Sequence, residues 1–378
     1  MIAPADFVAI LERNGIRFFA GVPDSLLQAF CAQVLRSNPP ERNVIAANEG
    51  SAVALAAGYH LGSGNAGCVY LQNSGLGNAV NPLVSLMDPQ VYGIPVLLLI
   101  GWRGELVGDA QLKDEPQHVK QGRITLELLD CLDIPYEILG ADTKEVDQLA
   151  TSLIARMRNE SRPVALVVRK DTFTSLKEDL PQPAYKLARE DALKAITESL
   201  PDDVIVVATT GKTSRELYEI RTAQGRSSES DFLTVGSMGH ALQIASGLAL
   251  ARPGRKVMCI DGDGALIMHM GGITTAAAIP NLSHVVINNG AHDSVGGQPT
   301  RGFEIDMPAL ARACGYGTAC RVTEAGEIGR AIREAVSAHG STFIEIRTRL
   351  GSRANLGRPK RSPAEAKREF MRSLGSAR

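Results

Sequence analysis

Short apolar runs rich in β-branched residues alternate along the first half of the chain with longer amphipathic stretches. The apolar runs predict strands at residues 18–20, 44–47, 68–71, 96–100 and 164–168. The spacing of apolar residues between them predicts helices at residues 6–14, 25–35 and 51–61. Strands and helices that alternate in this way are typical of a parallel sheet with helices on its faces.

The second half of the chain repeats this alternation, with strands predicted at residues 204–208, 256–260, 284–287 and 343–346. Between the halves, residues 170–190 are polar and contain prolines, which indicates an interdomain linker. We therefore predict an α/β protein with two doubly wound parallel-sheet domains. The expected boundaries are residues 1–178 for the first domain, 179–189 for the linker and 190–378 for the second domain.

Composition excludes several classes of function. The 378 residues suit two or three domains of roughly 150 residues each. The net charge of −1, from 40 Lys+Arg against 41 Asp+Glu, argues against general nucleic-acid binding, which needs a basic excess. The longest apolar stretch, residues 94–100, is far shorter than the roughly 20 residues of a membrane helix. With scattered cysteines and no secretory signal, we expect a cytoplasmic protein without a membrane or nucleic-acid partner.

Candidate chemistry is expected directly after the strands, because open α/β sheets bind ligands at the carboxyl ends of their strands. Asp263 follows one predicted strand between Gly262 and Gly264, and Asn288 and Asn289 follow the next. A carboxylate and an amide oxygen at neighbouring strand ends suit Mg²⁺, and the glycines let the backbone approach a diphosphate. A GxGxxG match at residues 62–67 precedes a strand, so it indicates a turn and speaks against a dinucleotide site.

The pair of motifs, GDG followed by NN, resembles the diphosphate-binding motif of thiamine diphosphate (ThDP) enzymes. Further segments are similar to the phosphonopyruvate decarboxylase family of these enzymes: residues 47–50, 72–78, 113–122, 236–240, 288–300 and 351–359. The resemblance covers nearly the whole chain in order. It implies a pyrimidine-binding first domain, a diphosphate-binding second domain and no middle domain, with ThDP and Mg²⁺ as cofactors.

The resemblance also implies the cofactor contacts. Glu49 is expected to hydrogen-bond the aminopyrimidine ring, although a glutamate at this position could instead cap a helix. Asp263, Asn289 and the carbonyl of Ala291 are expected to bind Mg²⁺. Met238 is expected to lie between the two rings of the cofactor. The other expected cofactor contacts are Asn73, Gly75, Gly77, Asn78, Thr209, Thr210, Gly211, Gly236, Gly262, Gly264 and Ala265. Lys212 suits a diphosphate contact and a solvated position equally well.

The substrate side is predicted from loops. Asp24 follows the first predicted strand and is expected near the reacting carbon. One histidine, His118 or His292, is expected to transfer a proton, because the imidazole pKa suits neutral pH. Further candidates for substrate contact are Ser25, Lys113, Asp293, Ser294 and Arg353. Arg353 could equally belong to a solvated basic tail, since residues 347–378 are rich in Lys and Arg.

The resemblance implies a ThDP- and Mg²⁺-dependent decarboxylation of 3-phosphonopyruvate to phosphonoacetaldehyde and CO₂, a step of phosphonate biosynthesis. It also implies a homo-oligomer, a dimer or a tetramer, with the cofactor between domains of different subunits. The nearest alternative is sulfopyruvate decarboxylase or another 2-keto acid decarboxylase of the same family. An alternative of another class is a catalytically silent α/β interaction protein.

Overall fold

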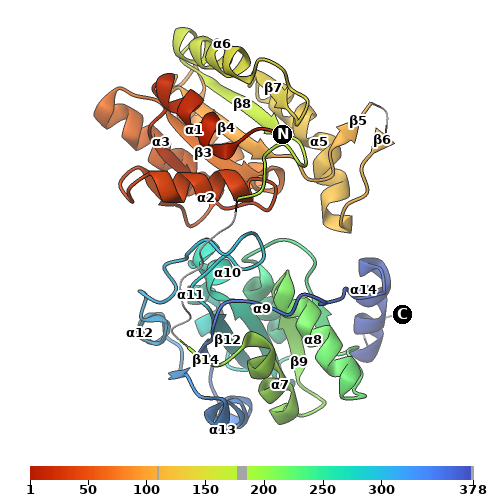
Figure 1. Cartoon of the computed structure of the whole chain (residues 1–378). Helices are drawn as coiled ribbons and strands as arrows, with labels where there is room; N and C mark the ends of the chain where they lie inside the picture. Colours follow the sequence, from red (N-terminus) through yellow and green to blue (C-terminus); the bar gives the residue numbers. More distant parts are fainter. Residues whose placement is uncertain (109, 177–184, 376–378) are drawn as a thin grey trace. The chain divides into compact units, whose positions relative to one another are not determined.

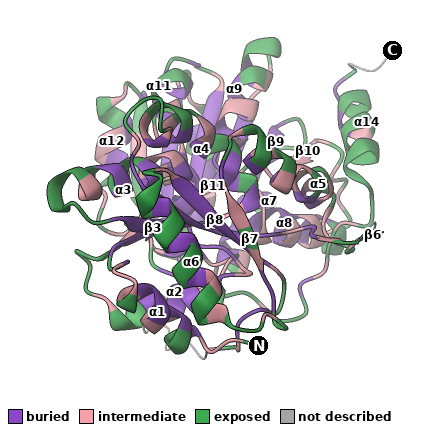
Figure 2. Cartoon of the chain, turned by 90° about the horizontal axis from the view of Figure 1, so that it is seen from above, coloured by how far each residue is buried: buried purple, intermediate pink, exposed green. Residues whose placement is uncertain are grey.

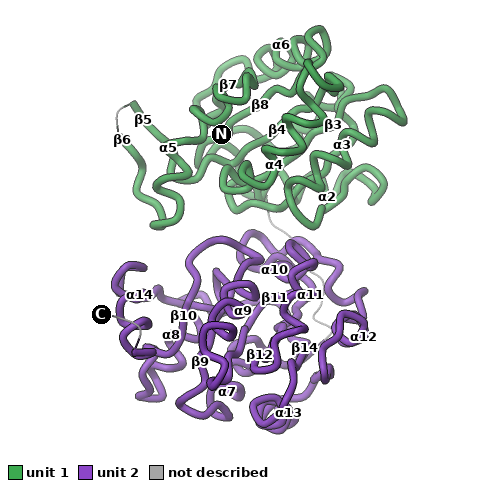
Figure 3. Tube along the Cα trace, turned by 180° about the vertical axis from the view of Figure 1, so that it is seen from behind, with its two compact units in different colours: residues 1–180 green, residues 181–378 purple. Residues whose placement is uncertain are grey.

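The computed structural model describes residues 1–108, 110–176 and 185–375. The chain divides into two compact units, unit 1 (Met1–Leu180) and unit 2 (Pro181–Arg378), shown in Figure 3. The predicted linker at residues 179–189 lies in part outside the described residues. Its described part, residues 185–188, leads into the first helix of unit 2.

Unit 1 contains a six-stranded sheet of order β2-β1-β3-β4-β8-β7, in which all paired strands are parallel (Figure 1). Its strands are β1 (Phe19–Gly21), β2 (Asn43–Ile45), β3 (Gly67–Gln72), β4 (Val96–Gly101), β7 (Tyr136–Leu139) and β8 (Pro163–Val168). Its helices are α1 (Pro4–Arg13), α2 (Gln28–Ser37), α3 (Glu49–Ser63), η1 (Asn73–Gly75), α4 (Leu76–Pro82), η2 (Leu83–Met87), α5 (Pro116–Cys131) and α6 (Val146–Asn159). The short strands β5 (Leu106–Val107) and β6 (Ala110–Gln111) form a separate antiparallel pair.

The central strands of this sheet are buried, as the purple colour of β3 and β8 in Figure 2 shows. Side chains of β4 alternate between the faces, as the period of a strand requires. Leu97 and Leu99 pack into one hydrophobic cluster, whereas Leu98 and Ile100 pack into the other. Burial on both faces explains why the central strands read as continuous apolar runs in the sequence.

Unit 2 has a second six-stranded parallel sheet, of order β10-β9-β11-β12-β14-β13. Its strands are β9 (Ile205–Ala208), β10 (Asp231–Leu233), β11 (Val257–Gly262), β12 (Leu282–Asn288), β13 (Thr318–Val322) and β14 (Thr342–Arg347). Its helices are α7 (Arg189–Ser199), α8 (Lys212–Ala223), α9 (Ala241–Ala251), α10 (Asp263–Met268), α11 (Gly272–Ala277), α12 (Met307–Ala313), α13 (Ala325–Ser337) and α14 (Pro363–Ser373).

The two sheets have the same topology. Counted along the chain, each sheet runs second, first, third, fourth, sixth and fifth strand. The connection changes direction beside the first strand, and in sheets of this kind ligands bind at the carboxyl ends of the strands next to such a switch point, here the first and third. The prediction of two doubly wound parallel-sheet domains is confirmed.

Besides the short pair β5 and β6, three strands of the six-stranded sheets escape the sequence prediction, namely β7, β10 and β13. Each lies at an edge of its sheet. Edge strands pair on one side only and are partly exposed, so they lack the continuous apolar run of a central strand. In β13, for example, only Val322 is buried. Among the described residues, no helix has the length and apolar character needed to cross a membrane.

Candidate active site

Glu49 occupies the first position of α3, just beyond β2. The preceding residue, Asn48, caps the helix, because its side chain accepts a hydrogen bond of 2.9 Å from the backbone of Ser51. Glu49 is therefore free of the capping role. Its side chain is buried, which raises the pKa of its carboxyl group, and Asn78 donates a hydrogen bond of 2.8 Å to Oε2.

Two of the predicted cofactor residues lie around Glu49. Asn78 is its hydrogen-bond donor, and a Cβ at Gly75 would overlap the Glu49 carboxyl group. Gly77 is different, because a Cβ there would meet no described atom within 4 Å. The side chain of Asn73 is buried and donates hydrogen bonds of 2.9 Å to the carbonyl of Arg103 and to Thr125. Asn73 therefore ties the end of β3 to the loop after β4.

Asp24 lies in the loop after β1 and is completely buried. Gln72, at the end of β3, donates a hydrogen bond of 2.5 Å to its Oδ1, and the backbone of Leu26 donates one of 3.0 Å to Oδ2. Burial outweighs these hydrogen bonds and raises the pKa of Asp24. The carboxyl edge of the unit 1 sheet thus holds two buried acids, Glu49 and Asp24, and burial raises the pKa of each.

Arg103 follows β4 and links several predicted site residues at the same edge. Its Nε and Nη2 donate to the two oxygens of Asp114 at 2.8 and 2.5 Å, and Nη1 donates to Ser25 at 3.0 Å. Although burial opposes it, hydrogen bonding from Arg103 lowers the pKa of Asp114 to about 2. His118 is buried, and burial together with the positive charge of Arg103 lowers its pKa. Lys113 is exposed.

Asp263 begins α10 directly after β11 in unit 2. Its side chain is buried, and burial raises its pKa to about 6 despite a hydrogen bond from Thr300. The backbone of Asn289 lies 3.5 Å from Oδ1 of Asp263, and the Oδ1 of Asn289 accepts from the backbone of Ala291 at 3.1 Å. The structure therefore brings the three predicted Mg²⁺ ligands together on neighbouring strand ends.

His292 and Met238 meet the GDG motif at Gly264. A Cβ at Gly264 would lie 3.1 Å from Nδ1 of His292 and 3.5 Å from the methyl carbon of Met238. His292 is buried, which lowers its pKa to about 4, and its Nδ1 has no hydrogen-bond partner among the described residues. Gly262 is open, since a Cβ there would meet no described atom within 4 Å.

The loop from His292 to Gln298 is anchored by charge. Asp293 accepts from Nη1 of Arg189 at 2.6 Å and from Nζ of Lys212 at 3.2 Å. The other edge of the Arg189 guanidinium is paired with Glu216 at 2.8 and 2.9 Å. Both oxygens of Asp293 are therefore engaged by this chain, which gives Asp293 an anchoring role.

The remaining predicted contacts of unit 2 lie around the same edge. Thr209, Thr210 and Gly211 lie between β9 and α8, and a Cβ at Gly211 would come within 2.7 Å of the Ser294 hydroxyl. Ala265 is buried within α10. Gly236 is half-buried in the loop after β10, and the neighbouring Ser237 has a positive φ of 55°.

Arg353 is held by carboxylates of this chain. It donates to Glu190 of α7 at 2.9 Å and forms an ion pair with Glu219 of α8. Two negative charges already balance the guanidinium, which leaves little attraction for a substrate anion. The tail beyond it forms α14, which is largely exposed (Figure 2) and inserts Phe370 against Phe232.

Three residues outside the predicted site occupy central positions: Arg103, Asp114 and Thr300. Arg103 has a weak signal in the sequence, since it comes just after the predicted strand 96–100. Asp114 and Thr300 lie in segments that carry the family resemblance. Their partners, however, come from other loops and become visible only in the folded chain.

Behind Asp263, three buried side chains converge on the face of the unit 2 sheet. The ligand atoms of Cys259, Asp261 and His284 lie within 4.8 Å of one another. Nε2 of His284 is 3.7 Å from Oδ2 of Asp261, and neither atom has a hydrogen bond among the described residues.

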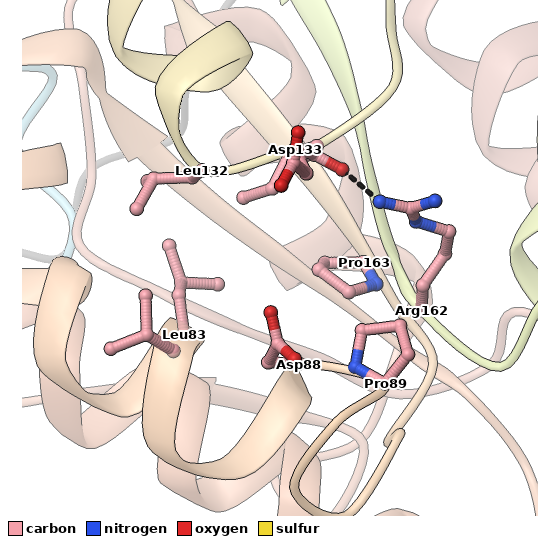
Figure 4. Close-up of a pocket in the computed structure, with 9 residues that line it drawn as sticks. Leu83, Asp88, Pro89, Leu132, Asp133, Arg162 and Pro163 are labelled. Carbon is pink, nitrogen blue, oxygen red and sulfur yellow. Dashed lines mark hydrogen bonds between the residues drawn. The ribbon is translucent and has the colours of Figure 1, made fainter.

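A small hollow of unit 1 lies away from this chemistry (Figure 4). Leu83, Asp88, Leu132 and Arg162 line it, and Pro163, at the amino end of β8, completes the wall. Its volume of about 10 Å³ is only enough for a single water molecule. The hollow is therefore not a substrate site.

The residues at the carboxyl edge of unit 2 fit a metal diphosphate. Asp263, Asn289 and the Ala291 carbonyl offer the oxygen ligands that Mg²⁺ prefers. The open position at Gly262 leaves room for a ligand beside them, and the unpartnered Nδ1 of His292 lies within the same region.

Comparisons with known proteins agree with this chemistry. Residues 3–124 match the family model of the thiamine pyrophosphate enzyme N-terminal TPP binding domain, and residues 209–346 match that of the C-terminal TPP binding domain. Thiamine pyrophosphate is another name for ThDP. Phosphonopyruvate decarboxylase of Streptomyces viridochromogenes is 39% identical, with 98% of this chain and 94% of that protein aligned. The enzyme of the same name from Streptomyces hygroscopicus is 38% identical over 98% and 93%. Sulfopyruvate decarboxylase of Methanosarcina acetivorans is 27% identical over 97% and 96%.

Proposed function

The chain belongs to the phosphonopyruvate decarboxylase family of thiamine pyrophosphate enzymes, and on this basis we propose that it converts 3-phosphonopyruvate to phosphonoacetaldehyde and CO₂. The observation that carries the proposal is the full-length similarity to two phosphonopyruvate decarboxylases, together with intact Glu49, Asp263 and Asn289 at the predicted strand ends. The reaction would serve phosphonate biosynthesis.

Unit 2 would hold the diphosphate end of the cofactor. Asp263, Asn289 and the Ala291 carbonyl would bind Mg²⁺, and Gly262 would let the backbone approach the diphosphate. When bound, ThDP supplies the electron sink that decarboxylation of a 2-keto acid requires. Met238 and Gly264 lie together beside His292. Met238 would contact the two rings of the cofactor, and Gly264 would contact its diphosphate.

Unit 1 would supply the proton chemistry. Glu49 would bind the aminopyrimidine ring through a carboxyl group that is buried and held by Asn78. The carbon that loses CO₂ must gain a proton before the aldehyde leaves. Asp24 suits this donation because it lies buried after β1 and burial raises its pKa, and His118 suits it as a relay because it is buried near Arg103, whose charge acts on both groups.

We also propose a homo-oligomer in which the pyrimidine-side domain of one subunit works with the diphosphate-side domain of another. The family resemblance supports this arrangement. Separate proteins named sulfopyruvate decarboxylase subunit beta and subunit alpha also align with 34% and 35% of this chain. A mass of 40.3 kDa by light scattering for the active enzyme, which is the mass of one chain, would refute the oligomer.

The test of the proposed function is CO₂ release from phosphonopyruvate by the purified protein with and without ThDP and Mg²⁺. We expect release only when both are present, and no release under any condition would overturn the proposal. Sulfopyruvate in competition for kcat/KM decides between the two acids, because a sulfonate carries one negative charge fewer than a fully ionised phosphonate. Calorimetry of ThDP with Mg²⁺ tests the catalytically silent alternative, which predicts no binding.

A further inference from the structure

We infer that Arg103 binds the phosphonate group of the substrate and thereby sets the preference for a 2-keto acid with a second anion. This inference rests on the proposed function and names the residue that would recognise its substrate. Arg103 is absent from the set of residues that the sequence predicts, and the folded chain places it among them.

The position of Arg103 is the first argument. It follows the carboxyl end of β4, which pairs with β3 in the unit 1 sheet. Its Nη1 contacts Ser25, whose neighbour Asp24 lies against Gly101 at the end of the same strand. The positive charge of Arg103 also acts on Asp24 and on His118. A cation at this point lies next to the groups proposed to handle the proton.

Arg103 also has N–H groups for which no acceptor is found among the described residues. A guanidinium has five N–H groups, and described residues accept from three of those of Arg103. The side chain is 22% exposed, so the remaining two N–H groups are not sealed in the core. By contrast, the Arg189 side chain is 5% exposed and pairs with two carboxylates.

The orientation of Arg103 is the third argument. Asp114 grips its guanidinium with both oxygens and is itself fixed by the backbone groups of Gly104 and Glu115, at 2.9 and 2.7 Å. A guanidinium that is already oriented loses little conformational entropy when a ligand binds. Asp114 occupies the Nε and Nη2 edge, and the remaining N–H groups, one on Nη1 and one on Nη2, can donate to phosphonate oxygens. Arg353 differs because two carboxylates, Glu190 and Glu219, pair with its guanidinium, whereas one, Asp114, pairs with that of Arg103.

The experiment measures binding of 3-phosphonopropionate, which has the carboxylate and the phosphonate of the substrate but no keto group. Calorimetry is carried out on the enzyme loaded with ThDP and Mg²⁺, for the wild type, Arg103→Gln and Arg103→Lys. Arg169→Lys is the matched control, because Arg169 has a similar side-chain exposure of 29%, pairs loosely with Glu105 at 3.9 Å and stacks on Trp102. ThDP affinity and the melting temperature show whether each variant is folded.

We expect Kd to rise about 30-fold or more in Arg103→Gln, which is the size expected for lost charge-assisted hydrogen bonds. Arg103→Lys keeps the charge but loses the fork, so its Kd should lie between those of the wild type and Arg103→Gln. Arg169→Lys should bind like the wild type. If folded Arg103→Gln binds as tightly as the wild type, or if the wild type does not bind the probe, the inference is wrong.

Turnover separates this inference from the proposed function. A wild type that releases CO₂ from phosphonopyruvate, together with an Arg103→Gln variant whose KM is unchanged, would refute the role of Arg103 and leave the function intact. A wild type that binds 3-phosphonopropionate through Arg103 but releases no CO₂ would refute the function and leave the anion site intact.

Discussion

Unit 1 and unit 2 share one strand order, yet the carboxyl edges of their sheets carry different chemistry. Unit 1 presents the groups proposed to handle protons, namely the buried acids Glu49 and Asp24, whose pKa burial raises, and the buried His118, whose pKa burial lowers. Unit 2 presents Asp263 and Asn289 as oxygen ligands beside the open glycine Gly262. The shared topology therefore determines at which edge of the sheet a ligand can bind, whereas the residues of the loops determine the chemistry at that edge.

The units also anchor their functional loops in similar ways. In unit 1, Arg103 forms an ion pair with Asp114, and in unit 2, Arg189 forms ion pairs with Asp293 and Glu216. The difference lies in burial, because the unit 2 pair is almost sealed while Arg103 is partly open. A sealed pair can serve only as an anchor, whereas an open one can also meet a ligand.

The largest expected effect is that of Glu49→Gln in unit 1, which should lower the catalytic rate and at the same time raise the stability of the fold. Glu49→Gln should lower kcat by about 10²- to 10⁴-fold, because the buried carboxyl group would handle a proton. The same change should raise the melting temperature of the cofactor-free protein at pH 8. Burial raises the pKa of Glu49, so the folded state favours the protonated acid, and ionised Glu49 costs stability.

The sign of this effect fixes its pH dependence. The contribution of Glu49 to stability is fully present below its unfolded pKa and is lost as pH rises through the raised folded pKa. A glutamine does not ionise, so the Glu49→Gln variant does not lose this contribution to stability as the pH rises. The gain in melting temperature should therefore be larger at pH 8 than at pH 5, and an equal gain at both values would contradict the role of burial.

The second prediction concerns the ion pairs by which Arg189 anchors the loop of Asp293 in unit 2. Arg189→Met should lower the free energy of unfolding of unit 2 by about 3–5 kcal/mol, because the buried Glu216 would remain as an uncompensated charge and Asp293 would keep only Lys212. Urea denaturation measures the change. Arg13→Met is the control, since its pair with Asp147 is 58% exposed on both sides and should contribute no more than about 1 kcal/mol. Equal effects for the two variants would argue against an anchoring role.

The third prediction concerns the metal ligands that distinguish unit 2. Asp263→Ala should weaken Mg²⁺-dependent binding of ThDP by more than about 100-fold, because it removes the only carboxylate among the proposed ligands. Calorimetry at a fixed Mg²⁺ concentration measures the loss. Asp202→Ala, at an exposed position paired with Arg226, should bind ThDP like the wild type. Unchanged affinity in Asp263→Ala would place the metal elsewhere.

The smallest expected effect tests the open glycine at the carboxyl end of β11. Gly262→Ala should leave the melting temperature unchanged, because a Cβ there meets no described atom within 4 Å. It should weaken ThDP binding about tenfold if the diphosphate approaches this backbone. Gly254→Ala, which is equally open but precedes the amino end of β11, should change neither quantity. Equal ThDP affinity in both variants would show that no ligand lies at Gly262.

Much of this protein follows from its sequence. The central strands are predictable because burial on both faces demands continuous apolar runs, as in β4 and β8. Asp263 and Asn289 are predictable as neighbours because each directly follows a strand, and parallel strands bring their carboxyl ends to one edge. Strands β7, β10 and β13 escape because their half-exposed edges leave no such run.

Only the tertiary structure decided which charged side chains form ion pairs within the chain and which retain hydrogen-bonding groups for a ligand. The sequence left Lys212, Asp293 and Arg353 as candidates for ligand contact, and the fold pairs Lys212 with Asp293 and Arg353 with Glu190 and Glu219. It also brings Ser25 to Arg103 across 78 residues. Pairings over such separations depend on how the loops meet at the edge of the sheet. Local residue patterns do not encode those meetings, so the folded chain alone shows which charged side chains are already paired with one another.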